Sequence, residues 1–230
     1  TPYYESRSSY TGIIDLAGFK KDRFYLYQAH WRPDLPMAHL LPHWSWPDRV
    51  GETTPVHLFT SGDEAELFLN GRSLGRKIRN PYEYRLRWDE VKYEPGELRV
   101  IVWKNGRKWA EERVTTAGEA AGMRVASDRM CLSADGHDLA FVTVSITDSQ
   151  GKLVPRAGHL VTFTVDGPAD LVATDNGDPT DMTAFPSPTR KAFSGNALAI
   201  IRSHQGEKGK VTVTATAPGV KEARVVLQCR

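Results

Sequence analysis

The chain has 230 residues, of which 40% are hydrophobic and 25% are charged, and its formal net charge is +2. These values are typical of a globular protein of one or two domains. Lysine and arginine are spread over both halves of the sequence, which argues against a nucleic-acid partner. No run approaches the roughly 18 apolar residues that a membrane span needs, so no membrane partner is expected.

Residues 1–36 lack the alternation of a strand and are predicted to form a loop and then a short amphipathic helix. Aromatic residues recur at helical spacing from Phe24 to Trp31, and Pro33 stops the helix. The first residues, Thr1 to Glu5, do not have the basic and apolar regions of a signal peptide. A short helix with so many large rings needs a surface to cover it, and the strands that follow offer no obvious one.

From Met37 the sequence alternates with a period of two, which indicates strands such as Val56–Thr60 and Ala65–Leu69. Asn70-Gly71 and Asn105-Gly106 each separate two such runs and predict β-hairpins. We therefore expect an antiparallel sandwich of roughly seven strands over residues 37–117.

A linker of small residues, 118–122, separates this region from a second series of strands. Leu139–Thr147 is long and rich in β-branched residues, and Val211–Ala215 has the alternation of a half-buried strand. The spacing of the strands and the absence of a long helical pattern predict a second immunoglobulin-like sandwich over residues 118–230. Cys131 and Cys229 are interpreted either as a disulfide between the first and last strands of this domain or as two buried thiols.

Five stretches carry a resemblance to a known family, and they occur in the expected order along the chain. They are Arg7–Phe19, Leu41–Trp46, Glu66–Gly75, Asp135–Val144 and Asp175–Pro179. Together they resemble the C-terminal portion of glycoside hydrolase family 2 β-galactosidases.

The resemblance implies an all-β fold of two consecutive immunoglobulin-like β-sandwiches, residues 37–117 and 118–230, preceded by the terminal segment of a (β/α)8 barrel, residues 1–36. It implies the N-terminal and catalytic domains of the parent enzyme as partners, a β-galactoside or polysaccharide as substrate, and a periplasmic or secreted location. It leaves homo-oligomerisation open.

A retaining glycosidase uses two carboxylates about 5–5.5 Å apart. In the resembled family these are glutamates at the ends of barrel strands upstream of this chain, so no catalytic residue is assigned here and the chain is predicted to be inactive alone. Its own neighbouring glutamates, such as Glu64 and Glu66 or Glu111 and Glu112, are interpreted as solvated strand residues. The sequence has no nucleophile elbow, phosphate loop or zinc motif, and no cofactor or metal is predicted.

His43, Trp44 and Trp46 are the candidate substrate-binding residues. They lie between Pro42 and Pro47, which favours display on a loop, and indole faces stack on the apolar faces of sugars. The favoured interpretation is nevertheless that the indoles fill a seam between the first sandwich and the barrel, with substrate contact and an ordinary core as the alternatives.

The segment Asp175–Asp181 contains oxygen ligands of the kind that calcium takes, but its spacing is not that of an EF-hand. A turn at Asn176-Gly177 is the favoured interpretation. The irregular loop from Asn176 to Arg190 has a length typical of functional or docking loops.

Two functional hypotheses follow. In the first, the chain is the C-terminal accessory region of a retaining β-galactosidase, which supports the barrel and shapes one rim of its active site. In the second, it is a stand-alone carbohydrate-binding or adhesion module. The aromatic helix argues against this hypothesis, because such a module has no use for a helix that belongs to a barrel.

Overall fold

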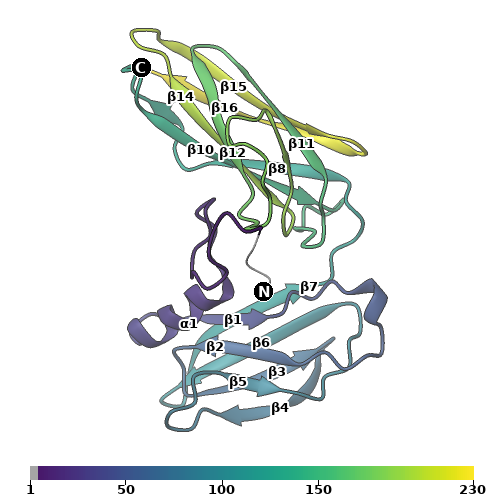
Figure 1. Cartoon of the computed structure of the whole chain (residues 1–230). Coiled ribbons are helices and arrows are strands. Elements are labelled where there is room, and N and C mark those ends of the chain that lie inside the picture. Colours follow the sequence, from purple (N-terminus) through teal and green to yellow (C-terminus); the bar gives the residue numbers. More distant parts are fainter. Residues whose placement is uncertain (1–4) are drawn as a thin grey trace. The chain divides into compact units, whose positions relative to one another are not determined.

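The computed structural model describes residues 5–230 and divides the chain into two compact units (Figure 1). The first unit is Lys20–Thr116, and the second combines the segment up to Phe19 with Ala117–Arg230. Both are built from β-sheets, as the sequence predicts, and the helical part of the described chain is limited to α1 and one short 3-10 turn. No helix in the described residues has the length and hydropathy needed to cross a bilayer.

The first unit contains two antiparallel sheets. The smaller sheet has the strand order β1-β2-β5, with β1 at Ala38–Leu41, β2 at Val56–Thr60 and β5 at Leu86–Trp88. The larger sheet has the order β4-β3-β6-β7, with β3 at Glu64–Leu69, β4 at Arg72–Ile78, β6 at Glu97–Lys104 and β7 at Arg107–Thr115. The 3-10 turn, Pro47–Arg49, follows β1.

The core of this unit lies between its two sheets. Every second residue of β3, and of β6 from Leu98 to Val102, is at most 1% exposed, as the period of two along a strand requires. These residues meet Val56 and Leu58 of β2 and the indole of Trp44. Both predicted hairpins are present, with positive φ at Asn70 (50°) and Asn105 (52°) and at the glycine that follows each. That geometry is the one that Asn-Gly adopts at little steric cost.

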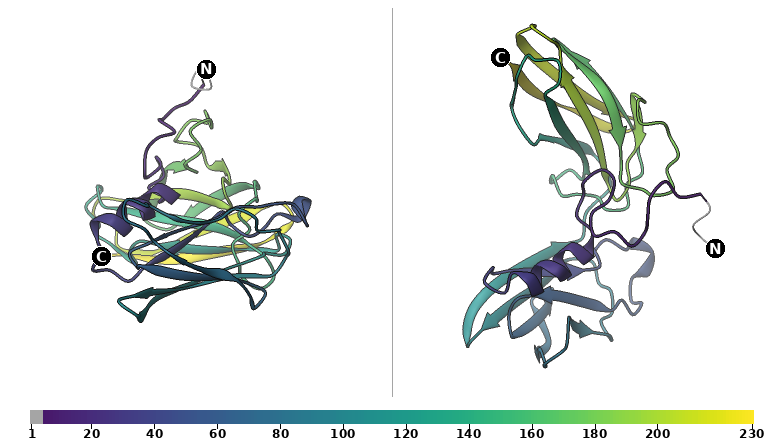
Figure 2. Two further views of the ribbon diagram at one scale, coloured as in Figure 1. Left: turned by 90° about the horizontal axis from the view of Figure 1, so that it is seen from below. Right: turned by 60° about the vertical axis from the view of Figure 1, so that its left-hand side comes forward.

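Helix α1, Asp22–Trp31, packs against β1 and β2 of the same unit (Figures 1 and 2). The ring of Tyr25 stacks on the imidazole of His39 in β1, with ring centroids 3.9 Å apart. His39 Nε2 also lies 2.9 Å from Asp22 Oδ1 at the start of the helix. The sequence offers no obvious packing surface for this helix, and the structure shows that β1 and β2 provide one, with His39 in direct contact. Trp31 nevertheless remains 70% exposed.

The second unit also contains two sheets. One has the strand order β12-β14-β10-β8, with β8 at Gly122–Ser127, β10 at Leu139–Thr147, β12 at Ala169–Asp175 and β14 at Asn196–Ser203. The other has the order β13-β11-β15-β16-β9, with β9 at Cys131–Leu132, β11 at Leu160–Asp166, β13 at Thr189–Lys191, β15 at Gly209–Ala217 and β16 at Val220–Cys229.

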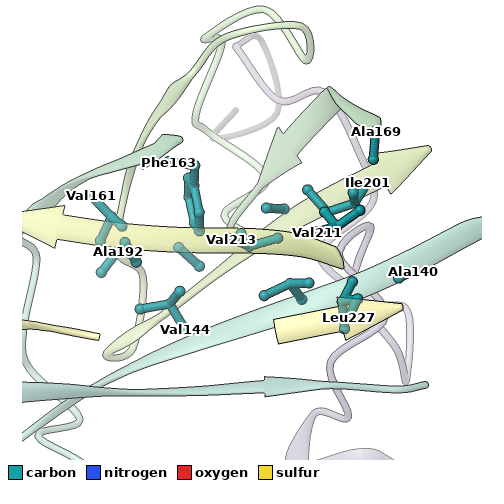
Figure 3. Close-up of a cluster of buried hydrophobic side chains, with 14 of the residues drawn as sticks. Ala140, Val144, Val161, Phe163, Ala169, Ala192, Ile201, Val211, Val213 and Leu227 are labelled. Atoms are coloured by element: carbon teal, nitrogen blue, oxygen red, sulfur yellow. The ribbon is translucent and has the colours of Figure 1, made fainter. Parts of the chain in front are cut away.

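The core of the second unit is made of aliphatic side chains around one phenylalanine. Figure 3 shows Val144, Phe163, Val211 and Val213 gathered between the strands, and all four are at most 2% exposed. Full burial of a side chain of this size stabilises a fold by roughly 1.5–3 kcal/mol. The alternation predicted for Val211–Ala215 therefore places the valines of β15 in this core.

The two cysteines are both free thiols. Cys131 in β9 and Cys229 in β16 lie on adjacent parallel strands, but the register pairs Cys229 with Leu132. Since neighbouring residues of a strand point to opposite faces, Cys229 is buried while Cys131 is exposed. The interpretation of a disulfide is therefore wrong, and so is that of two buried thiols.

The segment predicted to end a barrel, residues 1–36, is divided between the two units. Its described part up to Phe19 belongs to the second unit, and the part from Lys20 belongs to the first. The predicted features at residues 1–4 lie outside the described part. The origin of this segment in a barrel stays a prediction.

Candidate functional site

The loop that carries His43, Trp44 and Trp46 connects β1 to the 3-10 turn in the first unit. Trp44 is fully buried, and its indole Nε1 donates a hydrogen bond to the carbonyl oxygen of Glu94 at 3.0 Å. Its ring meets the edge of Tyr93, with centroids 4.9 Å apart. Trp44 is therefore a core residue that anchors the loop, and it is not displayed for stacking on a ligand.

Trp46 and His43, which are both half-buried, form a stacked pair within this loop. Their ring centroids are 4.1 Å apart, and Trp46 Nε1 donates to the carbonyl oxygen of His43 at 2.7 Å. The guanidinium of Arg49 lies over the indole of Trp46, 5.6 Å from its centroid. The structure thus brings two of the three predicted site residues together, while contact with a substrate stays a prediction.

The backbone of this loop is held by one buried hydroxyl. Tyr93, which has no exposed surface, accepts a hydrogen bond from the backbone N–H of Trp46 at 3.1 Å. Its hydroxyl also lies 3.2 Å from Thr116 Oγ1, which in turn donates to the carbonyl oxygen of Trp44 at 2.7 Å. The backbone of the loop at Trp44 and Trp46 is consequently held by the core beneath it.

Glu111 and Glu112 of β7 are half-buried and hydrogen-bonded, so their interpretation as solvated strand residues is wrong. Lys108, Arg113 and Arg99 donate hydrogen bonds to the Glu111 carboxylate and lower its pKa to about 2. Burial raises the pKa of Glu112, against the opposing effect of the bond it accepts from a backbone N–H. Neither side chain lines the two cavities of the second unit described below.

The segment Asp175–Asp181 forms the turn that the sequence favoured. Asp175 Oδ1 accepts the backbone N–H groups of Asn176 at 2.7 Å and Gly177 at 3.2 Å, and Gly177 has a φ of 78°. In residues 5–230 no cluster of three or more His, Cys, Asp or Glu side chains is arranged to hold a metal ion. The carboxylates of this segment are instead directed at backbone amides.

Arg190 organises the loop between β12 and β13, residues 176–188, which we call the β12–β13 loop. Its guanidinium is fully buried and donates to three backbone carbonyls, those of Thr174 at 2.7 Å, Ala184 at 2.9 Å and Thr183 at 3.1 Å. An ion pair with Asp181 at 3.3 Å compensates its charge. Sequence reasoning missed this residue, because most arginines are exposed to solvent and nothing in the short strand around Arg190 indicates that it is buried.

Within the second unit the β12–β13 loop also holds the chain near its start. The backbone N–H of Arg7 donates to the carbonyl oxygen of Pro179 at 2.8 Å, and its guanidinium lies 4.3 Å from the ring centroid of Phe185. A Cβ added at Gly177 would lie 2.0 Å from Asp15 Oδ2, so the carboxylate of Asp15 packs against Gly177 where any larger residue would displace it.

The second unit includes an apolar cavity and a polar cavity. The apolar cavity, of about 770 Å³, lies between the segment Leu16–Phe19 and the outer face of the β12-β14-β10-β8 sheet, where Phe141, Leu198 and Ile200 line it. The polar cavity, of about 650 Å³, lies among residues 155–160, the β12–β13 loop and residues 189–194. Its walls mix charged, hydroxyl and apolar side chains.

The chain matches two family models in different places. Residues 123–226 match "Glycoside hydrolase family 2 C-terminal domain 5", and residues 51–110 match a domain of unknown function, DUF4982. The resemblance drawn from the five stretches of sequence is thereby confirmed.

Similar proteins are considerably longer than this chain. The β-galactosidase BoGH2A of Bacteroides ovatus is 44% identical over 97% of the chain, and the chain covers 26% of that protein. A putative β-glucuronidase of Formosa agariphila is 33% identical over 91% of the chain and is covered to 20%. The crystal structure of a β-glycosidase from Bacteroides vulgatus superposes with a TM-score of 0.92 at 35% identity, covering 98% of this chain and 29% of that one.

Proposed function

We propose that this chain, which carries a glycoside hydrolase family 2 C-terminal domain over residues 123–226, is the C-terminal region of a retaining β-galactosidase. The parent enzyme hydrolyses terminal β-D-galactosyl residues with two glutamates that lie outside this chain. The observation that carries the proposal is the 44% identity to a β-galactosidase over 97% of the chain.

The role proposed for the chain is to support the catalytic barrel. In this proposal residues 1–36 are the end of the barrel, and the two sandwiches that follow are immunoglobulin-like. The exposed rings of Trp31 (70%) and Tyr27 (40%) on α1 support it, because large aromatic side chains left in water favour a surface that is covered in the parent enzyme. The partners of this chain are then the N-terminal and catalytic domains of the same polypeptide. A second copy of the enzyme is a further proposed partner.

We further propose that His43 and Trp46 contribute one rim of the active site. Trp44 and Tyr93 hold the backbone of the loop from below, which lowers the cost of ordering it when a sugar stacks on the face of the Trp46 indole that His43 leaves uncovered. A periplasmic or secreted location fits an enzyme that acts on polysaccharides.

The first test is the intact mass of the native protein, detected with an antibody against this chain. A species several times heavier than 25.7 kDa is expected. Detection of a 25.7 kDa species alone would contradict the proposal and would favour a stand-alone binding module.

The second test addresses the rim. In the parent enzyme Trp46→Ala is expected to raise KM for an aryl β-galactoside roughly threefold to tenfold with little change in kcat, since stacking contributes about 0.5–1.5 kcal/mol. Trp109→Ala, which removes another half-buried indole of the same unit, is the matched control. Equal kinetic effects of the two substitutions would contradict the assignment of Trp46 to the rim.

A further inference from the structure

The polar cavity of the second unit has a rigid wall. Asn176 is 2% exposed, and its Nδ2 donates both to Asp181 Oδ2 at 2.7 Å and to the carbonyl oxygen of Lys191 at 2.8 Å. Its Oδ1 accepts the backbone N–H of Asp178 at 2.9 Å. Together with the buried guanidinium of Arg190, these bonds fix the β12–β13 loop where it borders the cavity.

Two charged groups that line this cavity are not neutralised within the described chain. Asp178 uses Oδ1 to accept the N–H and the hydroxyl of Thr180, at 2.8 and 2.7 Å, while its Oδ2 has no partner among residues 5–230. Lys191 is exposed, and its Nζ likewise has no acidic group within 4.0 Å in that range. Its Cε lies beside Gly158, 3.3 Å from the position of an added Cβ. An acceptor and a donor are therefore both available to a ligand.

Apolar side chains border the same cavity. Phe193 is 41% exposed, Leu160 is 53% exposed and Met182 is 59% exposed, and all three belong to the lining. A wholly apolar ligand would bury the charges of Asp178 and Lys191 without partners, which is costly. A polyanion would meet the carboxylate of Asp178. A ligand with hydroxyl groups at its rim and a C–H face fits both kinds of wall.

We propose that the polar cavity is a binding site for a pyranoside, with Phe193 under the apolar face of the ring and Asp178 and Lys191 bound to its hydroxyl or carboxyl groups. The volume of about 650 Å³ lies in the range of roughly 300–1,000 Å³ that is usual for small-ligand sites. The choice of a sugar as the ligand class rests on the proposed function. The site itself rests on the lining of the cavity.

The test is a titration of the 230-residue chain, labelled with ¹⁵N, with methyl β-D-galactopyranoside and with methyl β-D-glucuronide. Saturable shifts of the amides of residues 155–160, 178–183 and 191–194 are expected with at least one of the two, with a Kd in the millimolar range or tighter, on the order of 10 mM at most. Binding of both in equal measure supports recognition of the hydroxyl groups. Tighter binding of the glucuronide that is lost in Lys191→Met supports recognition of the carboxylate by the ammonium group.

Phe193→Ala is expected to weaken binding about threefold to tenfold, through loss of the ring face. Phe141→Ala is the matched control, because Phe141 is 39% exposed in the same unit but lies on β10, away from this cavity. Both substitutions remove partly exposed rings, so both variants should keep their fold, which circular dichroism checks. Equal losses of affinity in the two variants would overturn the proposal.

The absence of saturable shifts up to about 50 mM of both glycosides would also overturn the proposal. That result would leave the proposed function intact, since the catalytic glutamates are sought outside this chain. Conversely, a native species of 25.7 kDa alone would contradict the proposed function without affecting binding at the polar cavity.

Discussion

Arg190 Nη2 donates to the carbonyl oxygen of Thr174 at 2.7 Å from a side chain that has no exposed surface. Thr174 lies in β12 and Arg190 in β13, so this bond joins the two strands that the β12–β13 loop connects. Burial of a guanidinium is tolerated only where its hydrogen bonds and its charge are satisfied. The bonds to Thr183 and Ala184 and the ion pair with Asp181 satisfy both requirements.

Arg190→Met is therefore expected to lower the free energy of unfolding of the second unit by about 3–5 kcal/mol, because it leaves buried carbonyls and the Asp181 carboxylate without their donor. Urea denaturation measures this loss. Arg202→Met is the control, since the side chain of Arg202 is 48% exposed and its only ion pair in the described chain, with Asp170, is 3.9 Å long. An equal loss of stability in the two variants would show that burial of Arg190 is not what stabilises the loop.

Gly177→Ala is expected to loosen the segment up to Phe19. The new Cβ displaces the carboxylate of Asp15, whose Oδ1 accepts the backbone N–H of Phe19 at 2.9 Å. Gly151→Ala is the matched control, because Gly151 has a φ of 79° and open space around it. Both substitutions incur about 1–2 kcal/mol for a left-handed alanine. Hydrogen exchange should accelerate at Phe19 only in the Gly177 variant, and unchanged exchange there would be the contrary result.

Stability of the first unit is expected to fall in acid through Glu111. Bonds from Lys108, Arg113 and Arg99 lower its pKa from 4.5 to about 2 in the folded protein. The folded state thus holds the proton less tightly than the unfolded chain, so the stabilisation is complete above about pH 4.5 and is lost as the pH falls towards 2. Glu111→Gln should flatten the dependence of urea midpoints on pH over this window.

The control for this substitution is Glu90→Gln. Glu90 is exposed and makes no ion pair within the residues that the structure covers. The Glu90→Gln substitution should leave the dependence of the urea midpoint on pH unchanged. A Glu111 variant with the wild-type slope would refute the assigned linkage.

His39→Ala is expected to release helix α1 from the first unit. It removes both the ring stacked on Tyr25 and the bond to Asp22, whereas His39→Phe keeps a ring in place. Loss of a stacked pair weakens docking by about 0.5–1.5 kcal/mol, so amide exchange in α1 should accelerate roughly tenfold in the alanine variant and less in the phenylalanine variant. Identical exchange in wild type and His39→Ala would contradict this role.

The sequence predicts those elements best whose signals are local. The bounds of Val56–Thr60 and Leu139–Thr147 agree with the observed strands, because β-branched alternation and flanking turn residues act within a few positions. Both Asn-Gly hairpins are predicted for the same reason.

Residues whose partners are distant in the sequence are predicted poorly. Trp44 lies between two prolines and was expected on a displayed loop, but its hydrogen-bond acceptor, Glu94, is 50 residues away. Arg190 finds its partners along an irregular loop that has no periodic pattern. Such burial depends on how the two sheets close, and neighbouring residues do not encode it.

The opposite environments of the two cysteines make the second unit suitable for attaching a single spectroscopic reporter. Burial raises the pKa of the Cys229 thiol, which is 1% exposed, so a maleimide reagent at neutral pH has little access to its thiolate. Cys131 is exposed at the neighbouring edge strand. Within this chain a fluorophore or spin label therefore attaches at one site, and the distance from this site to a second probe would measure how the second unit is placed in a parent enzyme freed of its other reactive thiols.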